Sequence, residues 1–83
     1  MIEMREHLER LLSELKKLTP KERAFVLNFV VNRTGNKSID QRNFEFDLTL
    51  NKFRNANRML RVFNMLYELT NEEIVKLAEK LRR

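Results

Sequence analysis

The side chains best suited to chemistry in this sequence are the basic and amide residues between Thr49 and Tyr67. At a helical spacing, five of them share one side of the segment: Asn51, Arg54, Asn55, Arg58 and Arg61. Arg and Asn have the shape for bidentate contact with guanine and adenine edges, and Arg also clamps phosphate. Lys52 falls nearer the apolar side and would reach only a phosphate backbone. Since no acid occurs from Leu48 to Tyr67, the segment predicts a polyanion-binding surface, with double-stranded DNA as the expected partner.

The element that would position these side chains is one long amphipathic helix over residues 49–67. Its opposite side is apolar and carries Leu50, Phe53, Ala56, Leu60, Phe63 and Tyr67. We expect this helix to lie at the centre of a small core, with the Tyr67 hydroxyl in water at the edge. Val62 and Met65 lie beyond the arginines, where they are either an exposed contact patch or covered by a neighbouring helix.

Composition limits the chain to one small domain with a densely charged surface. It has 83 residues, of which 42% are apolar and 35% charged, and a net charge of +5. Residues 1–18 and 67–83 are each electrically balanced, so the excess positive charge lies in the middle. There is no cysteine, one histidine (His7) and no catalytic or metal-binding motif, so we expect no enzyme, metal or cofactor. No apolar run is long enough for a bilayer span and no signal peptide is evident, so we expect a cytoplasmic protein.

The first helix is predicted from about Ile2 to Leu18. Its apolar residues follow a heptad seam at Met1, Met4, Leu8, Leu11, Leu15 and Leu18. Two interpretations stay open. The helix either packs on the domain's own core or pairs with its copy in a homodimer, in which case Met4, Leu8, Leu11 and Leu15 are the contact residues.

Capping signals set the bounds of two further helices. Thr19 and Glu22 form a capping box in front of a largely apolar helix from Pro20 to about Arg33, with Gly35 at its end. Thr70 and Glu73 form another before a helix over residues 71–81.

Residues 36–48 are ambiguous. A capping box at Ser38 favours a short helix to about Phe46, followed by a turn at Asp47-Leu48, whereas the alternation of Phe44, Phe46, Leu48 and Leu50 is typical of a strand. We choose the helix. The fold prediction is therefore a single all-α domain over residues 1–83, with about five helices: a possible dimerisation helix (1–18), a core (19–67) and a C-terminal helix (70–83).

Segment 38–60, SIDQRNFEFDLTLNKFRNANRML, resembles the helix-turn-helix of bacterial and phage regulators. A helix starts at Ser38, Asp47-Leu48 form the turn and Thr49 caps the second helix. The segment departs from that pattern at Arg42 and Asn43, which replace an apolar and a small residue, and at Asp47, which replaces the turn glycine. The resemblance implies that helix 49–67 lies in the major groove.

A shorter stretch, LTPKERAFV over residues 18–26, resembles the opening of the DNA-binding domain in some phage terminase small subunits. Together these features predict a small homodimeric DNA-binding protein, in transcription regulation or another DNA-handling role of a phage, plasmid or bacterium. The alternative is a helical protein-interaction module with a protein partner and no nucleic-acid role. A steep salt dependence of binding would distinguish the first from the second.

Overall fold

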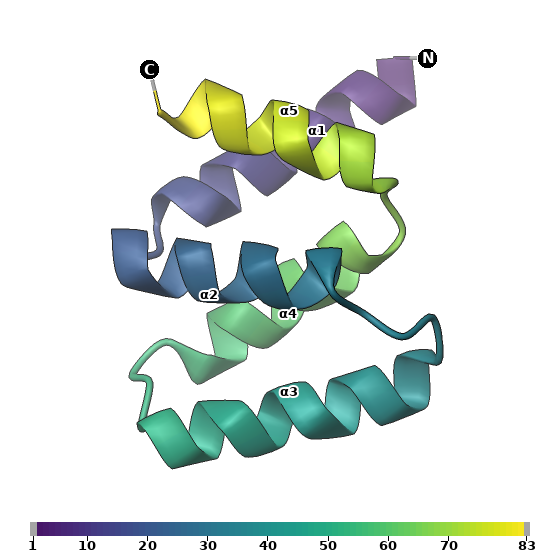
Figure 1. The fold of residues 1–83 in the computed structure, drawn as a ribbon. Coiled ribbons are helices and arrows are strands. Elements are labelled where there is room, and N and C mark those ends of the chain that lie inside the picture. The colour runs from purple at the N-terminus through teal and green to yellow at the C-terminus, as the bar shows by residue number, and fades with distance from the viewer. Residues whose placement is uncertain (1, 83) are drawn as a thin grey trace.

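Five α-helices follow one another along the chain, which confirms the all-α prediction. The computed structural model describes the backbone of residues 2–82 and the side chains of residues 6–82. The helices are α1 (Ile2–Lys16), α2 (Pro20–Val31), α3 (Lys37–Asn51), α4 (Ala56–Tyr67) and α5 (Asn71–Leu81). They form three tiers, with α1 and α5 in the first, α2 and α4 in the second and α3 alone in the third (Figure 1). None of these helices is long and apolar enough to cross a bilayer.

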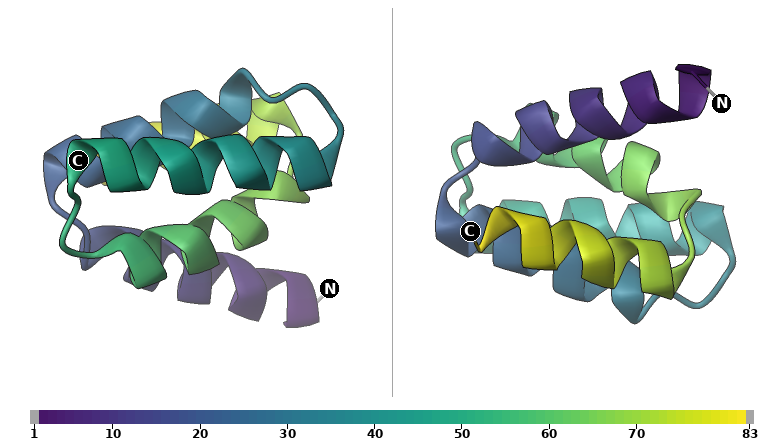
Figure 2. Two further views of the ribbon diagram at one scale, coloured as in Figure 1. Left: turned by 90° about the horizontal axis from the view of Figure 1, so that it is seen from below. Right: turned by 90° about the horizontal axis from the view of Figure 1, so that it is seen from above.

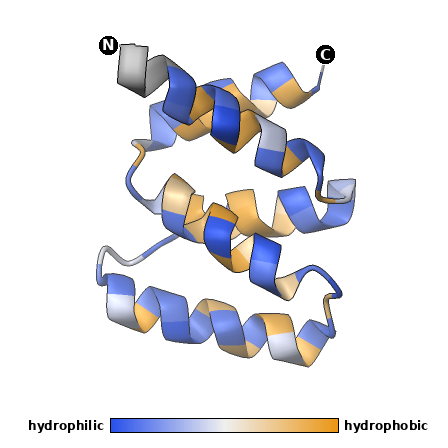
Figure 3. Cartoon of the chain, turned by 180° about the vertical axis from the view of Figure 1, so that it is seen from behind, coloured by the Kyte–Doolittle hydropathy of each residue, from blue (hydrophilic) through white to orange (hydrophobic). Residues whose placement is uncertain are grey.

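Helix α4 lies at the centre of the bundle, where it packs against α1, α2 and α3. Hydrophobic residues gather where the middle helices face the outer ones (Figure 3). The α4 side chains Met59, Val62, Phe63 and Leu66 are fully buried, and Met65 packs half-buried against them. Val62 and Met65 are therefore part of the core and not a contact patch.

Both predicted capping boxes are present. The Thr19 N–H donates to Glu22 Oε1 at 2.8 Å, and the Glu22 N–H donates to Thr19 Oγ1 at 3.2 Å. The reciprocal bonds between Thr70 and Glu73 measure 2.9 and 3.2 Å. Each pair satisfies two backbone N–H donors that the start of the helix would otherwise leave unpaired, so local chemistry alone starts α2 and α5.

Helix α2 ends earlier than expected, at Val31, and Gly35 lies further along the loop at φ 99°. Arg33, predicted as the last helical residue, instead ties this loop to the α4–α5 turn. Its guanidinium donates to the Leu69 carbonyl at 2.7 Å and to Asn71 Oδ1 at 3.0 Å. The middle and first tiers are thus joined at this end.

Residues 37–51 form one helix, so the predicted turn at Asp47-Leu48 is wrong, as is the strand alternative. Asn36 caps the helix by accepting from the Ile39 N–H at 3.2 Å. The alternating apolar residues divide between two helical faces: Phe44 and Leu48 point into the core, whereas Phe46 and Leu50 are exposed. Two overlapping pairs at i and i+4 imitate the two-residue period of a strand.

The single helix predicted over residues 49–67 is also wrong. The chain leaves α3 at Lys52, whose left-handed backbone (φ 53°, ψ 43°) reverses its direction, and α4 begins only at Ala56. The Leu48 carbonyl closes the helix end by accepting from the Phe53 N–H at 3.4 Å. Residues 52–55 contain no Gly or Pro, so the usual local signal for such a turn is missing.

The reversal brings together aromatic rings that a continuous helix would keep far apart. The ring of Phe44 in α3 stacks on that of Phe63 in α4 with centroids 4.6 Å apart, and it meets the ring of Phe29 edge-on at 5.0 Å. Along one straight helix, Phe44 and Phe63 would be separated by about 28 Å. Phe53 follows the turn inward to Phe25, with centroids 5.0 Å apart. Burial of these rings therefore outweighs the local preference for a continuous helix.

A buried carboxylate anchors the other end of α3. Asp40 accepts from the Thr34 hydroxyl at 2.8 Å, from the Gly35 N–H at 3.2 Å and from the Tyr67 hydroxyl at 2.6 Å. Burial alone would raise the pKa of Asp40, but these hydrogen bonds outweigh it and hold the pKa below its usual value. Burial and the bond to Asp40 together raise the pKa of Tyr67. The expectation that the Tyr67 hydroxyl lies in water is therefore wrong.

Two phenylalanines on α3 give a matched test of this packing. Phe44→Ala should lower the free energy of unfolding by about 3–5 kcal/mol, because it removes a fully buried ring and leaves a cavity. Phe46→Ala should change it by less than about 0.5 kcal/mol, because the ring is exposed. Urea unfolding followed by circular dichroism measures both, and similar costs for the two variants would contradict the packing described.

The hydrogen bonds to Asp40 should make the stability of the fold depend on pH. Because the folded pKa lies below the unfolded one, ionised Asp40 stabilises the fold above the unfolded pKa, and this contribution is lost as the pH falls through the folded pKa. Asp40→Asn should be less stable at neutral pH and should lose less stability on acidification. Tyr67→Phe should show a smaller change in the same direction. Urea unfolding across a pH series tests this, and an unchanged acid slope in Asp40→Asn would refute it.

Candidate nucleic-acid interface

Two turns that are distant in sequence lie at the same end of the bundle. The α1–α2 turn and the α3–α4 turn share this end in both views of Figure 2. A direct contact joins them, because the Asn55 side chain donates from Nδ2 to Glu22 Oε1 at 3.0 Å. Residues on either side of both turns are therefore held in fixed relation to one another.

Glu22 is the buried acid at this junction. Only 4% of it is exposed, and its carboxylate accepts from the Thr19 backbone and from Asn55. Burial alone would raise the pKa of Glu22, but these hydrogen bonds lower it below its usual value. Glu22 is thus ionised at neutral pH, with its oxygens turned inward to its own chain.

Glu14 on α1 is a second acid near this end, and three cations surround it. Its carboxylate lies 3.0 Å from Arg58 Nη1, 3.3 Å from Lys17 Nζ and 3.8 Å from Arg61 Nε. Burial would raise the pKa of Glu14, but the neighbouring Lys17, Arg58 and Arg61 bring it below its usual value. One negative charge is shared among three positive ones, so this cluster stays positive overall.

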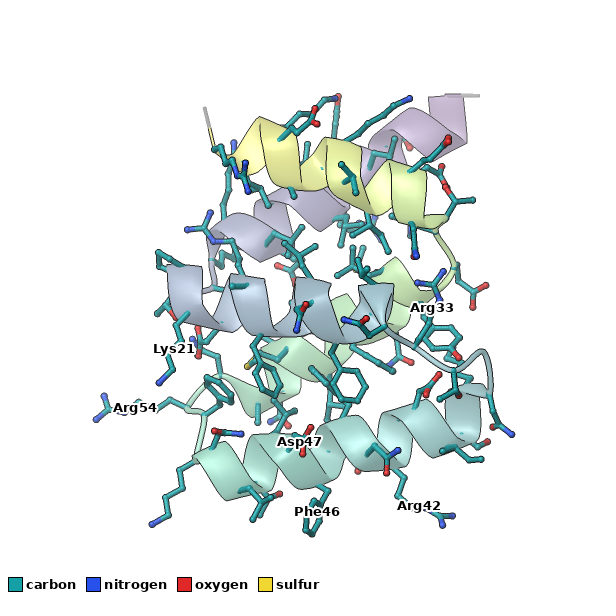
Figure 4. All side chains as sticks on the ribbon, viewed as in Figure 1. Lys21, Arg33, Arg42, Phe46, Asp47 and Arg54 are labelled. Carbon is teal, nitrogen blue, oxygen red and sulfur yellow. The ribbon has the colours of Figure 1, made fainter. Side chains whose placement is uncertain are left out.

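We group six of the cations at this end of the molecule and call them the basic end. They are Lys17, Lys21, Lys52, Arg54, Arg58 and Arg61. Three segments supply them: the start of α2 with the turn before it, the α3–α4 turn, and the first two turns of α4. Figure 4 shows the side chains of Lys21 and Arg54 extending outward at this end. Their charge concentrates on one surface although Lys17 and Arg61 are 44 positions apart in the sequence.

The structure gathers the predicted DNA-binding residues at one end, but not on one helix face. Asn51 closes α3 and donates its amide to the Asp47 carbonyl at 2.8 Å, so that group already has a partner. Lys52 and Arg54 are exposed in the turn, whereas Asn55 is engaged by Glu22. Arg58 and Arg61 lie on α4 beside α1.

Sequence reasoning missed Lys17 and Lys21. Both lie beside the Thr19 turn, and Lys17 belongs to a segment that is electrically balanced as a whole. The contact between Asn55 and Glu22 is what places them beside the α3–α4 turn. The sequence does carry a signal, because Lys16, Lys17 and Lys21 lie close together around the start of a helix. Net charge summed over the whole of residues 1–18 hides the first two of them.

The predicted dimer contact on α1 is largely used within the chain. Leu11 and Leu15 are fully buried in its own core, which is a correction to the dimerisation prediction for these two residues. Leu8 is half-buried and packs against the same core, and the Met4 side chain lies outside the described residues. The described part of the heptad seam, from Leu8 to Leu18, thus belongs to the bundle because α4 and α5 pack against α1.

The fold and this surface define a class: a five-helix all-α bundle with positive charge focused at one end. Comparison with protein-family models, curated proteins and solved structures finds no match to the chain. Any proposal for its function therefore rests on the chemistry of its own side chains.

Substitutions of two neighbouring residues in the α3–α4 turn, Arg54 and Asn55, should differ in their effect on stability. Asn55→Ala should lower the free energy of unfolding by about 1–2 kcal/mol, because it removes a hydrogen bond to the buried Glu22 carboxylate. Arg54→Ala should leave stability unchanged, because the side chain is exposed. Thermal and urea unfolding measure both. If Asn55→Ala left the free energy of unfolding unchanged, the contact between the two turns would not support the site.

Proposed function

We propose that the chain is a small DNA-binding protein that contacts the phosphate backbone through the basic end. The observation that carries this proposal is the meeting of six cations from three segments around two acids, both of which are engaged inside the chain. A surface of this kind attracts a polyanion, because each neutralised phosphate releases counterions.

The geometry favours phosphate contact over base reading. The two amides proposed to read adenine, Asn51 and Asn55, donate to groups within the chain. Arg58 is held by Glu14 at 3.0 Å. Lys21, Lys52 and Arg54 are exposed, and no salt bridge among the described side chains involves them. Flexible cations on turns suit a backbone whose charge is uniform along the duplex.

Insertion of α4 into the major groove is not part of this proposal. A recognition helix needs one broad side free of its own protein. Helix α4 packs against α1, α2 and α3, and of its twelve residues only Asn57 and Arg61 are exposed. Contact through the end of the bundle requires no such free side. The resemblance to helix-turn-helix regulators accordingly supports a DNA-handling role here, but not their mode of docking.

The proposed setting is the cytoplasm of a bacterium, in transcription regulation or another DNA-handling step encoded by a phage, plasmid or host. The protein acts there as a homodimer. Neither role requires a cofactor, because the cations themselves supply the binding chemistry.

Fluorescence anisotropy of labelled duplexes of two unrelated sequences tests the proposal over a salt series. The native chain should bind both at low salt and should lose affinity steeply as salt rises. The double variant Lys21→Ala/Arg54→Ala should bind both more weakly by the same factor, and its log–log salt slope should be smaller by about two, at about 0.9 per lost phosphate contact.

The matched control is Lys76→Ala/Lys80→Ala on the exposed part of α5, which removes the same charge elsewhere. It should keep the native salt slope. Equal losses in the two double variants would mean that net charge alone governs binding. Absence of binding at about 50 mM salt, where several phosphate contacts should act strongly, would end the DNA-binding proposal.

A further inference from the structure

The outer face of α3 carries an apolar stripe that the bundle does not cover. Ile39 is 49% exposed, Phe46 63% and Leu50 62%. All three lie on the side opposite the core residues Phe44 and Leu48. Figure 4 shows Phe46 pointing away from the other helices. Three large apolar side chains aligned along one helix form a contact surface, whereas scattered single ones do not.

The stripe has the spacing of a two-helix seam. With Asn43 between them, the residues fall at 39, 43, 46 and 50, at intervals of 4, 3 and 4. In heptad terms, Ile39 and Phe46 occupy d positions, and Asn43 and Leu50 occupy a positions. A single Asn at an a position is the device by which parallel two-stranded coiled coils set register and number of strands, since it pairs with the same Asn of the second helix.

The charged residues beside the stripe complement each other across a two-fold axis. Arg42 holds the g position and Asp47 the e position that follows five residues later. In a parallel pair of helices, a g side chain meets the e side chain five residues further along the other helix. Arg42 of each copy therefore faces Asp47 of the other. Within the described part of the chain, neither residue takes part in a salt bridge.

We propose that a second copy of this chain covers the stripe, with the two α3 helices parallel and in register. Phe46 and Leu50 then pack on their own counterparts, Asn43 pairs with Asn43, and two Arg42–Asp47 bridges flank the seam. The rest of each bundle lies on the far side of its α3, so the two copies meet without obstruction (Figure 1). Both basic ends then point the same way, because each adjoins the end of α3.

This interface is short, about 16 Å of helix from Ile39 to Leu50. An interface of that length belongs to the weak class, so the dimer should form only at high protein concentration. Dimerisation is measured without nucleic acid, so it stands or fails independently of DNA binding.

A single introduced cysteine tests contact and direction together, because the chain has none of its own. Asn43→Cys should form a disulfide-linked dimer when copper phenanthroline and oxygen accept the two electrons and two protons of the thiols. Glu79→Cys, exposed on α5, is the matched control and should stay monomeric. In an antiparallel pair, residue 43 would face Phe46 and not itself. Linkage no faster than in the control would overturn the parallel arrangement.

Sedimentation velocity over about 1 μM to 1 mM supplies the second readout. The native chain should pass from monomer to dimer, and Phe46→Asp should weaken association by tenfold or more, as expected for an aromatic at the centre of an interface. Val75→Asp, on the exposed face of α5, should not.

The charges provide a final check. Arg42→Asp and Asp47→Arg should each weaken association, and the double variant should restore it. A native chain that stays monomeric up to 1 mM would overturn the proposal and leave the stripe to a different protein. A dimer indifferent to Phe46→Asp would place the interface elsewhere and overturn it as well.

Discussion

The stacking of Phe44 on Phe63 is the contact on which the positions of α3 and of the basic end depend. These rings belong to consecutive helices, so they meet only if the chain reverses between them, and it does so at residues 52–55. The reversal places Lys52 and Arg54 on a projecting turn and brings Asn55 to Glu22. A core interaction thus creates the surface that is proposed to bind DNA, although no residue of that surface takes part in the stack.

The same contact explains why α3 has two unlike faces. Its inner face is held by Phe44, Leu48 and the Asp40 anchor, which together account for its attachment to the bundle. Phe46 and Leu50 add nothing to that attachment, because more than half of each is exposed. Polar residues at those two positions would leave the fold equally well supported. The apolar stripe therefore has no role within a single copy of the chain, which is the physical ground for seeking its partner outside it.

Sequence reasoning succeeded where structure is determined locally and failed where distant contacts decide. The Thr19 and Thr70 capping boxes define helix starts through residues three apart, so α2 and α5 were predicted closely. The break after Lys52 depends on ring burial across the core and has no Gly or Pro to announce it. The partner of the Tyr67 hydroxyl lies 27 residues away, at Asp40. Four cations of the basic end, Lys52, Arg54, Arg58 and Arg61, were predicted from the charge of their own segment. Lys17 and Lys21 were not, because only the folded chain brings them beside that segment.

Electrostatics gives a further reason to regard the basic end as more than a solvated surface. Cations gathered on one surface repel one another, and the fold offsets this repulsion only partly, through Glu14. Lys21, Lys52 and Arg54 lie outside that cluster, and no salt bridge among the described side chains involves them. Their contribution to stability is therefore close to zero or slightly unfavourable. A polyanion would reduce this repulsion, and Lys21, Lys52 and Arg54 would gain the partners that they lack in the isolated bundle.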